Sequence, residues 1–192
     1  MTKSHKPLSH LALLVVAFSF SVLGIHTTAS AQERHESSAP LQAFIQGGLG
    51  NQDTDAYLVG AGRLLPWHKN LSLGLLTLYA EAAIGRWHSN GPKGSSTAWP
   101  TQLGVTPVLR LYPASYPKWF GEIGVGGNYI VPLFQSGEKR FSTEFNFGDH
   151  AAIGRSFGAW DVAVRVEHFS NAGIAHPTPG ENFLQVRAAH RL

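Results

Sequence analysis

The sequence predicts an all-β protein, specifically an eight-stranded antiparallel up-and-down transmembrane β-barrel. Beyond Ser38, apolar and polar residues alternate over many windows of about ten residues, and these windows are even in number. No window in this part of the chain shows a sustained apolar period of about 3.6 residues, so helices are not expected. Compact connections alternating with longer ones and aromatic residues near the segment ends are typical of bacterial outer-membrane barrels.

The N-terminal segment reads as an export signal. Lys3 and Lys6 form a basic start, an apolar run covers 11–24, and Ala29-Ser30-Ala31 is a small-residue cleavage site. We therefore expect a signal peptide over residues 1–31 and an outer-membrane β-barrel domain over 32–192, with an uncleaved membrane anchor as the alternative.

Composition restricts the class of protein further. Removing residues 1–31 leaves 161 of the 192 residues, which suits one domain with a sizeable core. Two of the 15 lysines and arginines lie in the leader, so the formal net charge falls from +3 to +1 and does not favour a nucleic-acid partner. The chain has no cysteine, which excludes thiol catalysis, thiolate metal sites and disulfides.

Each period-two window is assigned to one strand. The eight expected strands lie near 41–50, 55–64, 71–87, 97–112, 118–131, 141–154, 158–170 and 181–192. Three connections are compact (65–70, 113–117 and 155–158), and three are longer and rich in Gly, Pro and polar residues (88–96, 132–140 and 171–180). The first connection, 51–54, is short and departs from this alternation.

Aromatic residues near the strand ends suggest two membrane-interface girdles. The residues near the compact connections are Trp67, Tyr112, Tyr116, Trp119 and Trp160, and those near the longer loops are Trp87, Trp99 and Tyr129. An exported soluble β-sandwich or a lipocalin-like barrel is the alternative fold.

The seventh expected strand distinguishes the two faces of the sheet. Val162, Val164 and Val166 alternate with Asp161, Arg165 and Glu167, so one face is apolar and the other charged. In a membrane barrel the charged face must be the interior, where we expect it to pair with charges of neighbouring strands such as Arg187 or Arg191.

The polar end of this strand is the candidate catalytic site. His168 and Ser170 continue the valine row, so they are expected on the lipid-facing surface, at the outer leaflet if both chain ends are periplasmic. A histidine beside a serine is the base and nucleophile arrangement of acyl transfer. Glu181 is the candidate acid that orients the imidazole. The backbone amides of Ala172 and Gly173, with the Asn171 side chain, are candidate oxyanion donors.

Two motifs carry a family resemblance: "HFSNAG" at 168–173 and "PTPGENF" at 177–183. Together they resemble the lipid A 3-O-deacylases of the PagL family, which are outer-membrane enzymes. The resemblance implies a serine esterase with Ser170 as nucleophile, His168 as base, Glu181 as acid and Asn171 as a motif residue. Thr178 stands where family members often carry an asparagine proposed to assist the oxyanion hole.

The resemblance also implies the substrate: lipid A of lipopolysaccharide, losing the ester-linked 3-hydroxyacyl chain at position 3 amid outer-membrane lipids. No metal or cofactor is expected, because the remaining histidines show no ligand spacing. Lys93, Lys139 and Arg140 are candidate contacts for lipid A phosphates. A homodimer is compatible with this interpretation. The alternatives are a non-catalytic barrel serving adhesion or membrane integrity, and an acyltransferase that uses the same serine.

Overall fold

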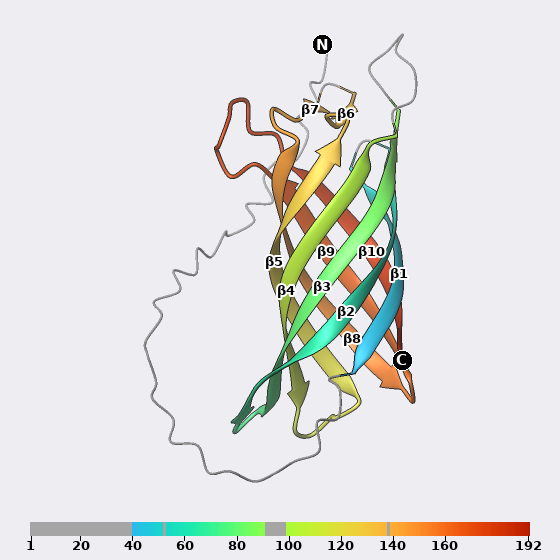
Figure 1. Cartoon of the computed structure of the whole chain (residues 1–192), viewed down its shortest axis with the longest axis vertical. Helices are drawn as coiled ribbons and strands as arrows, with labels where there is room; N and C mark the ends of the chain where they lie inside the picture. Colours follow the sequence, from blue (N-terminus) through green and yellow to red (C-terminus); the bar gives the residue numbers. More distant parts are fainter. Residues whose placement is uncertain (1–39, 52, 91–98, 138) are drawn as a thin grey trace, which may run out of the picture. The chain divides into compact units, whose positions relative to one another are not determined.

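Eight long β-strands close into a single antiparallel barrel in the computed structural model, which describes residues 40–51, 53–90, 99–137 and 139–192 (Figure 1). The barrel strands are β1 Leu41–Gly50, β2 Thr54–Leu71, β3 Gly74–Ser89, β4 Thr101–Pro113, β5 Trp119–Val131, β8 Phe145–Phe157, β9 Trp160–Ser170 and β10 Glu181–Arg191. The predicted fold class is therefore confirmed. The expected signal peptide lies outside the described residues.

Pairing of the first strand with the last closes the barrel. β1 pairs with β10 from Gln42 opposite Arg191 to Gly50 opposite Phe183, so the chain enters and leaves at one end, which we call the terminal rim. The opposite end, the loop rim, carries the connection between β9 and β10 and a short hairpin of β6 (Gln135–Ser136) and β7 (Lys139–Arg140) (Figure 1). No described residue belongs to a helix long and apolar enough to span a membrane.

Two strands extend through segments that were expected to be turns. β2 continues through 65–70 to a turn at 72–73, because a β-bulge between Leu64 and His68 takes up the irregularity around Pro66. β8 begins at Phe145 and continues to Phe157, and the turn then falls at Gly158, whose φ of 63° suits glycine. Both corrections shift strand ends and leave the pairing order unchanged.

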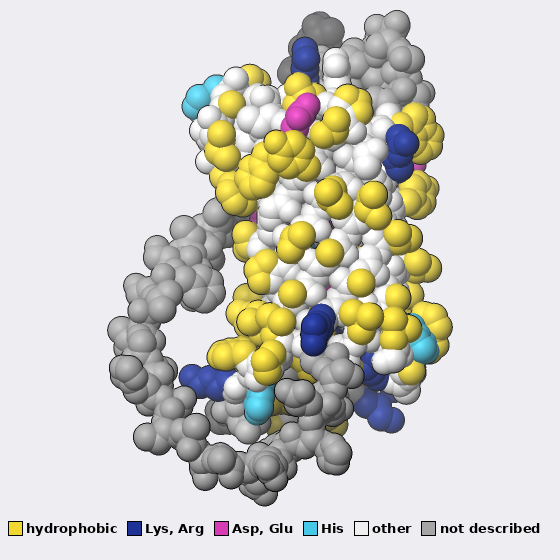
Figure 2. All heavy atoms as spheres, viewed as in Figure 1, with side chains coloured by type: hydrophobic (Ala, Val, Ile, Leu, Met, Phe, Trp, Pro, Cys, Tyr) yellow, Lys and Arg dark blue, Asp and Glu magenta, His cyan; other side chains and the backbone are white. Residues whose placement is uncertain are grey.

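The apolar face of the sheet points outward and the charged face points inward, which is the reverse of the arrangement in a soluble barrel. Every barrel strand presents an exposed branched aliphatic residue outward: Ile45, Val59, Ile84, Val105, Ile123, Ile153, Val164 and Val186. Figure 2 shows hydrophobic side chains spread over the visible face of the barrel, with charged side chains mainly toward its two ends. On β9, Val164 is 47% exposed while Arg165 is 4% exposed, which confirms the predicted face assignment.

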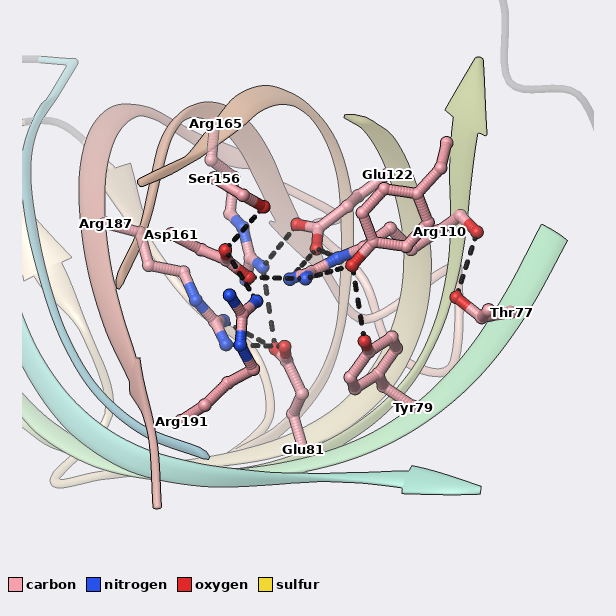
Figure 3. Close-up of polar contacts among 11 residues, drawn as sticks. Thr77, Tyr79, Glu81, Arg110, Glu122, Ser156, Asp161, Arg165, Arg187 and Arg191 are labelled. Atoms are coloured by element: carbon pink, nitrogen blue, oxygen red, sulfur yellow. Dashed lines mark hydrogen bonds and ion pairs between the residues drawn. The ribbon is translucent and has the colours of Figure 1, made fainter. Parts of the chain in front are cut away.

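A network of buried ion pairs fills the half of the barrel toward the terminal rim (Figure 3). Arg110 contacts Glu122 at 2.5 Å and Asp161 at 2.8 Å, while Arg187 contacts Glu81 at 2.6 Å. The predicted pairing of Asp161 with Arg191 is present at 3.0 Å.

The other two charges of the seventh expected strand find partners on different strands from those expected. Arg165 lies between Glu81 and Glu122, at 3.5 and 3.4 Å, rather than against a residue of β10. Glu167 accepts a hydrogen bond from Gln46 at 3.3 Å. These contacts cross the barrel interior, because an eight-stranded barrel is narrow enough for side chains of distant strands to meet.

An aromatic cluster fills the half of the barrel toward the loop rim. Trp87 is fully buried and packs edge-on against Phe134, Phe169 and Phe183, with ring centroids 4.7 to 5.1 Å apart. Its indole Nε1 donates a hydrogen bond of 2.7 Å to Gln102. The expected placement of Trp87 in an interface girdle is therefore wrong.

Tyr112 also differs from the girdle prediction, because it faces inward and receives a hydrogen bond from Arg110 at 3.0 Å. Exposed aromatic residues do occur toward both ends of the barrel: Trp67, Tyr116, Trp119 and Trp160 near the terminal rim, and Trp99 and Tyr129 near the loop rim. Six of the eight residues assigned to the girdles are therefore exposed near a rim, and Tyr57, Phe147 and Phe157 are further exposed aromatic residues.

Replacing Glu81 by glutamine should strongly destabilise the barrel. Arg187 would then be buried without its carboxylate partner and Arg165 would keep only Glu122; removing one partner of a buried pair costs about 3 to 5 kcal/mol. Urea unfolding of the refolded protein in lipid vesicles measures this loss. The exposed Glu144 gives a matched control, since Glu144→Gln should change the unfolding free energy by less than about 0.5 kcal/mol. Equal stability of the two variants would contradict the network's role.

Replacing Val164 by arginine tests the outward face. Val164 lies midway along β9 and points out of the barrel, so an arginine there should cost about 2 to 4 kcal/mol in a bilayer. The same vesicle unfolding assay applies, with Val164→Thr as the uncharged control. A fully tolerated arginine would mean that this face does not meet lipid.

Candidate active site

His168 and Ser170 lie on the outer face of β9 where the strand reaches the loop rim. Both are partly exposed and continue the row of Val162, Val164 and Val166. This is the lipid-facing placement predicted from the alternation. Residues i and i+2 of a strand have Cα atoms about 6.5 to 7 Å apart on one face, so the imidazole can reach the hydroxyl.

Neighbouring strands place polar residues on both sides of His168. In the sheet register, Asp149 of β8 lies opposite His168 on one side and Asn182 of β10 on the other. The Nδ1 atom of His168 lies 2.7 Å from the Asn182 side-chain oxygen. An amide oxygen accepts hydrogen bonds only, so this contact places the imidazole proton on Nδ1 and leaves Nε2 as the basic nitrogen.

The backbone of Gly180 lies against the imidazole. A Cβ atom at this position would lie 2.3 Å from the Cε1 atom of His168 and 3.0 Å from Nε2. Contacts this short between heavy atoms are strongly repulsive, so any larger residue would displace the ring or the loop. Gly180 therefore lets the loop approach closely enough to define the ring position.

The Ser170 hydroxyl is free of protein partners among the residues that the structure describes. It makes no hydrogen bond to His168 in this conformation. Catalytic hydrogen bonds are often long before substrate binds and shorten only in the complex. Ser170 thus presents a partly exposed hydroxyl beside His168, whose Nε2 atom is the ring nitrogen free to accept a proton.

Glu181 lies on the other face of the sheet. It pairs in register with the inward-facing Phe169, and its side chain is fully buried inside the barrel. Its carboxylate contacts the Lys139 ammonium at 2.9 Å, and the same lysine donates to the Gly180 carbonyl at 2.8 Å. The structure therefore does not bring Glu181 into hydrogen-bond contact with His168.

Side-chain alternation explains this difference from the expected triad. Glu181 returns to the height of the site, as predicted, but the residue that shares a face with His168 is the one directly opposite it. That residue is Asn182, which the sequence interpretation did not select. The sequence separation of 14 between His168 and Asn182 fits the observed pairing, but the register could not be read from sequence alone.

The loop after Ser170 is organised by Asn171. Its side-chain oxygen accepts a hydrogen bond of 3.0 Å from the Gly173 amide, and its side-chain nitrogen donates one of 2.8 Å to the Ala175 carbonyl. The Gly173 amide and the Asn171 side chain, both expected to serve an oxyanion hole, are thus engaged within the turn. Ala172, with a φ of 49°, occupies the left-handed region that non-glycine residues rarely adopt.

The remaining candidates make no hydrogen bond to His168 or Ser170 within the described part of the chain. Thr178 is exposed and its hydroxyl lies 3.3 Å from the ring nitrogen of His176. Of the cations expected to contact phosphates, Lys139 pairs with Glu181, Arg140 is exposed, and Lys93 lies outside the described residues. No group of three His, Asp or Glu side chains within the described part of the chain could hold a metal ion.

Comparison with solved structures supports the architecture. The chain superposes on "Crystal structure of the outer membrane enzyme PagL" with a TM-score of 0.69 and 24% identity, covering 79% of this chain and 99% of that one. A designed protein, "De novo design of transmembrane beta-barrels", matches with a TM-score of 0.52 and 12% identity, covering 80% of this chain and 96% of that one. Both likenesses concern the fold.

Sequence comparison identifies relatives. The lipid A deacylase PagL of Pseudomonas aeruginosa is 30% identical over 176 residues, 88% of this chain and 91% of that protein. The protein of the same name from Bordetella bronchiseptica is 29% identical over 120 residues, 62% of this chain and 65% of that protein. The family model "Lipid A 3-O-deacylase (PagL)" matches residues 55–191. The chain therefore belongs to the lipid A 3-O-deacylase (PagL) family.

Proposed function

We propose that this protein is a lipid A 3-O-deacylase of the outer membrane, a serine esterase that removes the 3-hydroxyacyl chain at position 3 of lipid A. Ser170 is the nucleophile and His168 is the general base. The observation that carries the proposal is the position of this pair on the lipid-facing surface at the loop rim, within a chain of this family.

Placement on the outer face supports a lipid substrate. An ester bond of a membrane lipid lies just below its headgroup, at the level where a barrel passes from its apolar band to its polar rim. The pair follows three exposed valines on β9, so acyl chains can lie against the valines while the ester reaches Ser170. Polar side chains on a lipid-facing surface are costly, which favours a functional reason for them.

Acylation begins with proton transfer from Ser170 Oγ to His168 Nε2 as the oxygen attacks the ester carbonyl carbon. The resulting tetrahedral oxyanion needs a nearby hydrogen-bond donor. The Ala172 amide is the candidate that remains from the predicted set, since Asn171 and Gly173 bind each other. Collapse of the intermediate breaks the ester carbon–oxygen bond, and the departing sugar oxygen takes the proton from His168.

Deacylation repeats these steps with water. His168 takes a proton from a water molecule as its oxygen attacks the acyl-Ser170 carbonyl, and the second intermediate expels Ser170, which regains its proton. The products are a 3-hydroxy fatty acid and lipid A with a free 3-hydroxyl. Apart from the substrate and water, these steps use only side chains and backbone amides at the loop rim.

The substrate is expected in the outer leaflet. With an even number of barrel strands, the start of β1 and the end of β10 lie on one side of the membrane, so a periplasmic terminal rim places the loop rim outside. Lipid A occupies that leaflet. Arg140 is the exposed cation of the expected set on the loop rim and is available to a lipid A phosphate.

Replacing Ser170 by alanine should abolish deacylation. Without the nucleophile the rate should fall at least about 1,000-fold, because Ser170 and His168 act as a unit. Mass spectrometry of lipid A from Gram-negative cells expressing each protein measures the loss of one 3-hydroxyacyl group. Wild type should remove it and Ser170→Ala should not.

Ser72→Ala provides the matched control, since Ser72 is exposed in the turn between β2 and β3 at the opposite rim. It should behave as wild type. Unchanged lipid A in all three strains, with folded barrels in the outer membrane and a 3-O-acylated substrate present, would favour the non-catalytic barrel instead.

A further inference from the structure

We propose that Asn182, rather than Glu181, is the positioning residue that holds His168 in its reactive tautomer, and that Glu181 acts indirectly by anchoring the segment that carries Asn182. The inference rests on the proposed function, because it assigns the third member of the Ser170 and His168 site. It follows from the face of the sheet on which each side chain lies.

Asn182 meets the geometric requirement for this role. It lies directly opposite His168 in the pairing of β9 with β10, and its side-chain oxygen is 2.7 Å from His168 Nδ1. Gly180 closes the same side of the imidazole, with no room for a Cβ. The ring is therefore held by a hydrogen bond to Asn182 of β10 and by a backbone contact from Gly180, just before that strand.

An amide can replace a carboxylate in this position. The orienting residue of a catalytic histidine accepts the Nδ1 proton and keeps Nε2 free, and papain-like proteases use asparagine for this purpose. A neutral amide orients the ring without the electrostatic stabilisation that a carboxylate would give to the protonated imidazole. Asn182 should thus fix the tautomer without placing a charge beside the ring.

Glu181 has a different set of contacts, on the inside of the barrel. Its carboxylate binds Lys139 of β7 at 2.9 Å, and Lys139 also binds the Gly180 carbonyl. One ammonium group thereby ties the β6–β7 hairpin to the two residues that precede Asn182. Successive residues of β10 thus perform two tasks, since Glu181 anchors the strand from inside and Asn182 contacts His168 from outside.

Asp149 is the ionisable group facing His168 from the other neighbouring strand. It lies opposite His168 in the β8–β9 pairing, on the outer face between Phe147 and Ala151. No ion pair within 4.0 Å joins it to His168 among the described residues. The Asp149 side chain is the same in wild type and in the Asn182 variants, so it does not account for a difference between their pH profiles.

Asn182→Leu and Asn182→Asp test the proposed role. In a micellar assay with purified barrel and lipid A, Asn182→Leu should lower kcat about tenfold or more with little change in KM, because it removes an orienting hydrogen bond. Asn182→Asp should keep the enzyme active and move the acidic limb of the pH profile to higher pH. The sign follows because a carboxylate favours the protonated imidazole, which cannot act as base. A limb that stays in place would mean that residue 182 does not contact the imidazole that acts as the base.

Glu181→Gln and Lys139→Met test the indirect role of Glu181. If the pair acts as an anchor, both substitutions should reduce activity to a similar extent, and the double variant should be no worse than either one. An active Glu181→Gln variant with normal kcat would reject the anchoring role of Glu181, and the Asn182 variants would then decide the positioning role by themselves.

Two outcomes would overturn the inference. One is wild-type kcat and pH profile in both Asn182 variants. The other is loss of activity in Glu181→Gln with no effect of Lys139→Met, which would assign Glu181 to the histidine. Ser170→Ala, run beside them, separates this failure from failure of the proposed function: an active Ser170→Ala would reject the nucleophile itself, whatever the Asn182 variants do.

Discussion

The strict alternation of side chains in a closed barrel is the constraint on which the rest of this structure depends. Closure gives every strand one face toward lipid and one toward a narrow interior. The outer face must be apolar midway along the strands, so the charges there are directed inward, and exposed charges such as Arg86 and Arg155 lie toward the strand ends. Buried charges are tolerated only when paired, and the interior accordingly contains crossing contacts such as Arg187 with Glu81 and Arg110 with Asp161.

The candidate site is an exception to this division, and its position follows from the division. His168 and Ser170 are polar residues on an otherwise apolar face, and they occur where β9 leaves the apolar band. The contacts that hold them combine both faces of the sheet. Asn182 and Gly180 act on His168 from outside, while Lys139 holds the same strand end from inside through Glu181. A membrane enzyme can thus expose its chemistry to lipid and place the supporting ion pair within the barrel.

Features that depend on period-two alternation could be predicted from the sequence. These include the strand count, the inward direction of Asp161 and Arg165, and the outward direction of His168 and Ser170. Features that depend on register could not be predicted, because a shift by one residue exchanges the two faces. Glu181 is the clearest case, since its carboxylate suggested a triad while the pairing of Phe169 with Glu181 directs it inward.

Trp87 and the continuation of β2 show two further limits of the pattern. A tryptophan near a strand end looks the same in sequence whether it joins a girdle or fills the interior, and Trp87 fills the interior. The segment 65–70 contains proline and polar residues typical of a turn, yet a bulge lets β2 pass through it. In both cases contacts with other strands decide the outcome over local composition: the aromatic cluster for Trp87 and the pairing with β3 for β2.

Covalent labelling of the nucleophile tests the central claim most directly. A long-chain alkyl fluorophosphonate, presented to the folded barrel in lipid vesicles, reacts with a serine only when a neighbouring base activates it. Peptide mass spectrometry should find the adduct on Ser170, and His168→Ala should abolish it. An adduct on another residue, or an enzyme inactivated without modification of Ser170, would contradict a lipid-facing serine esterase at this site.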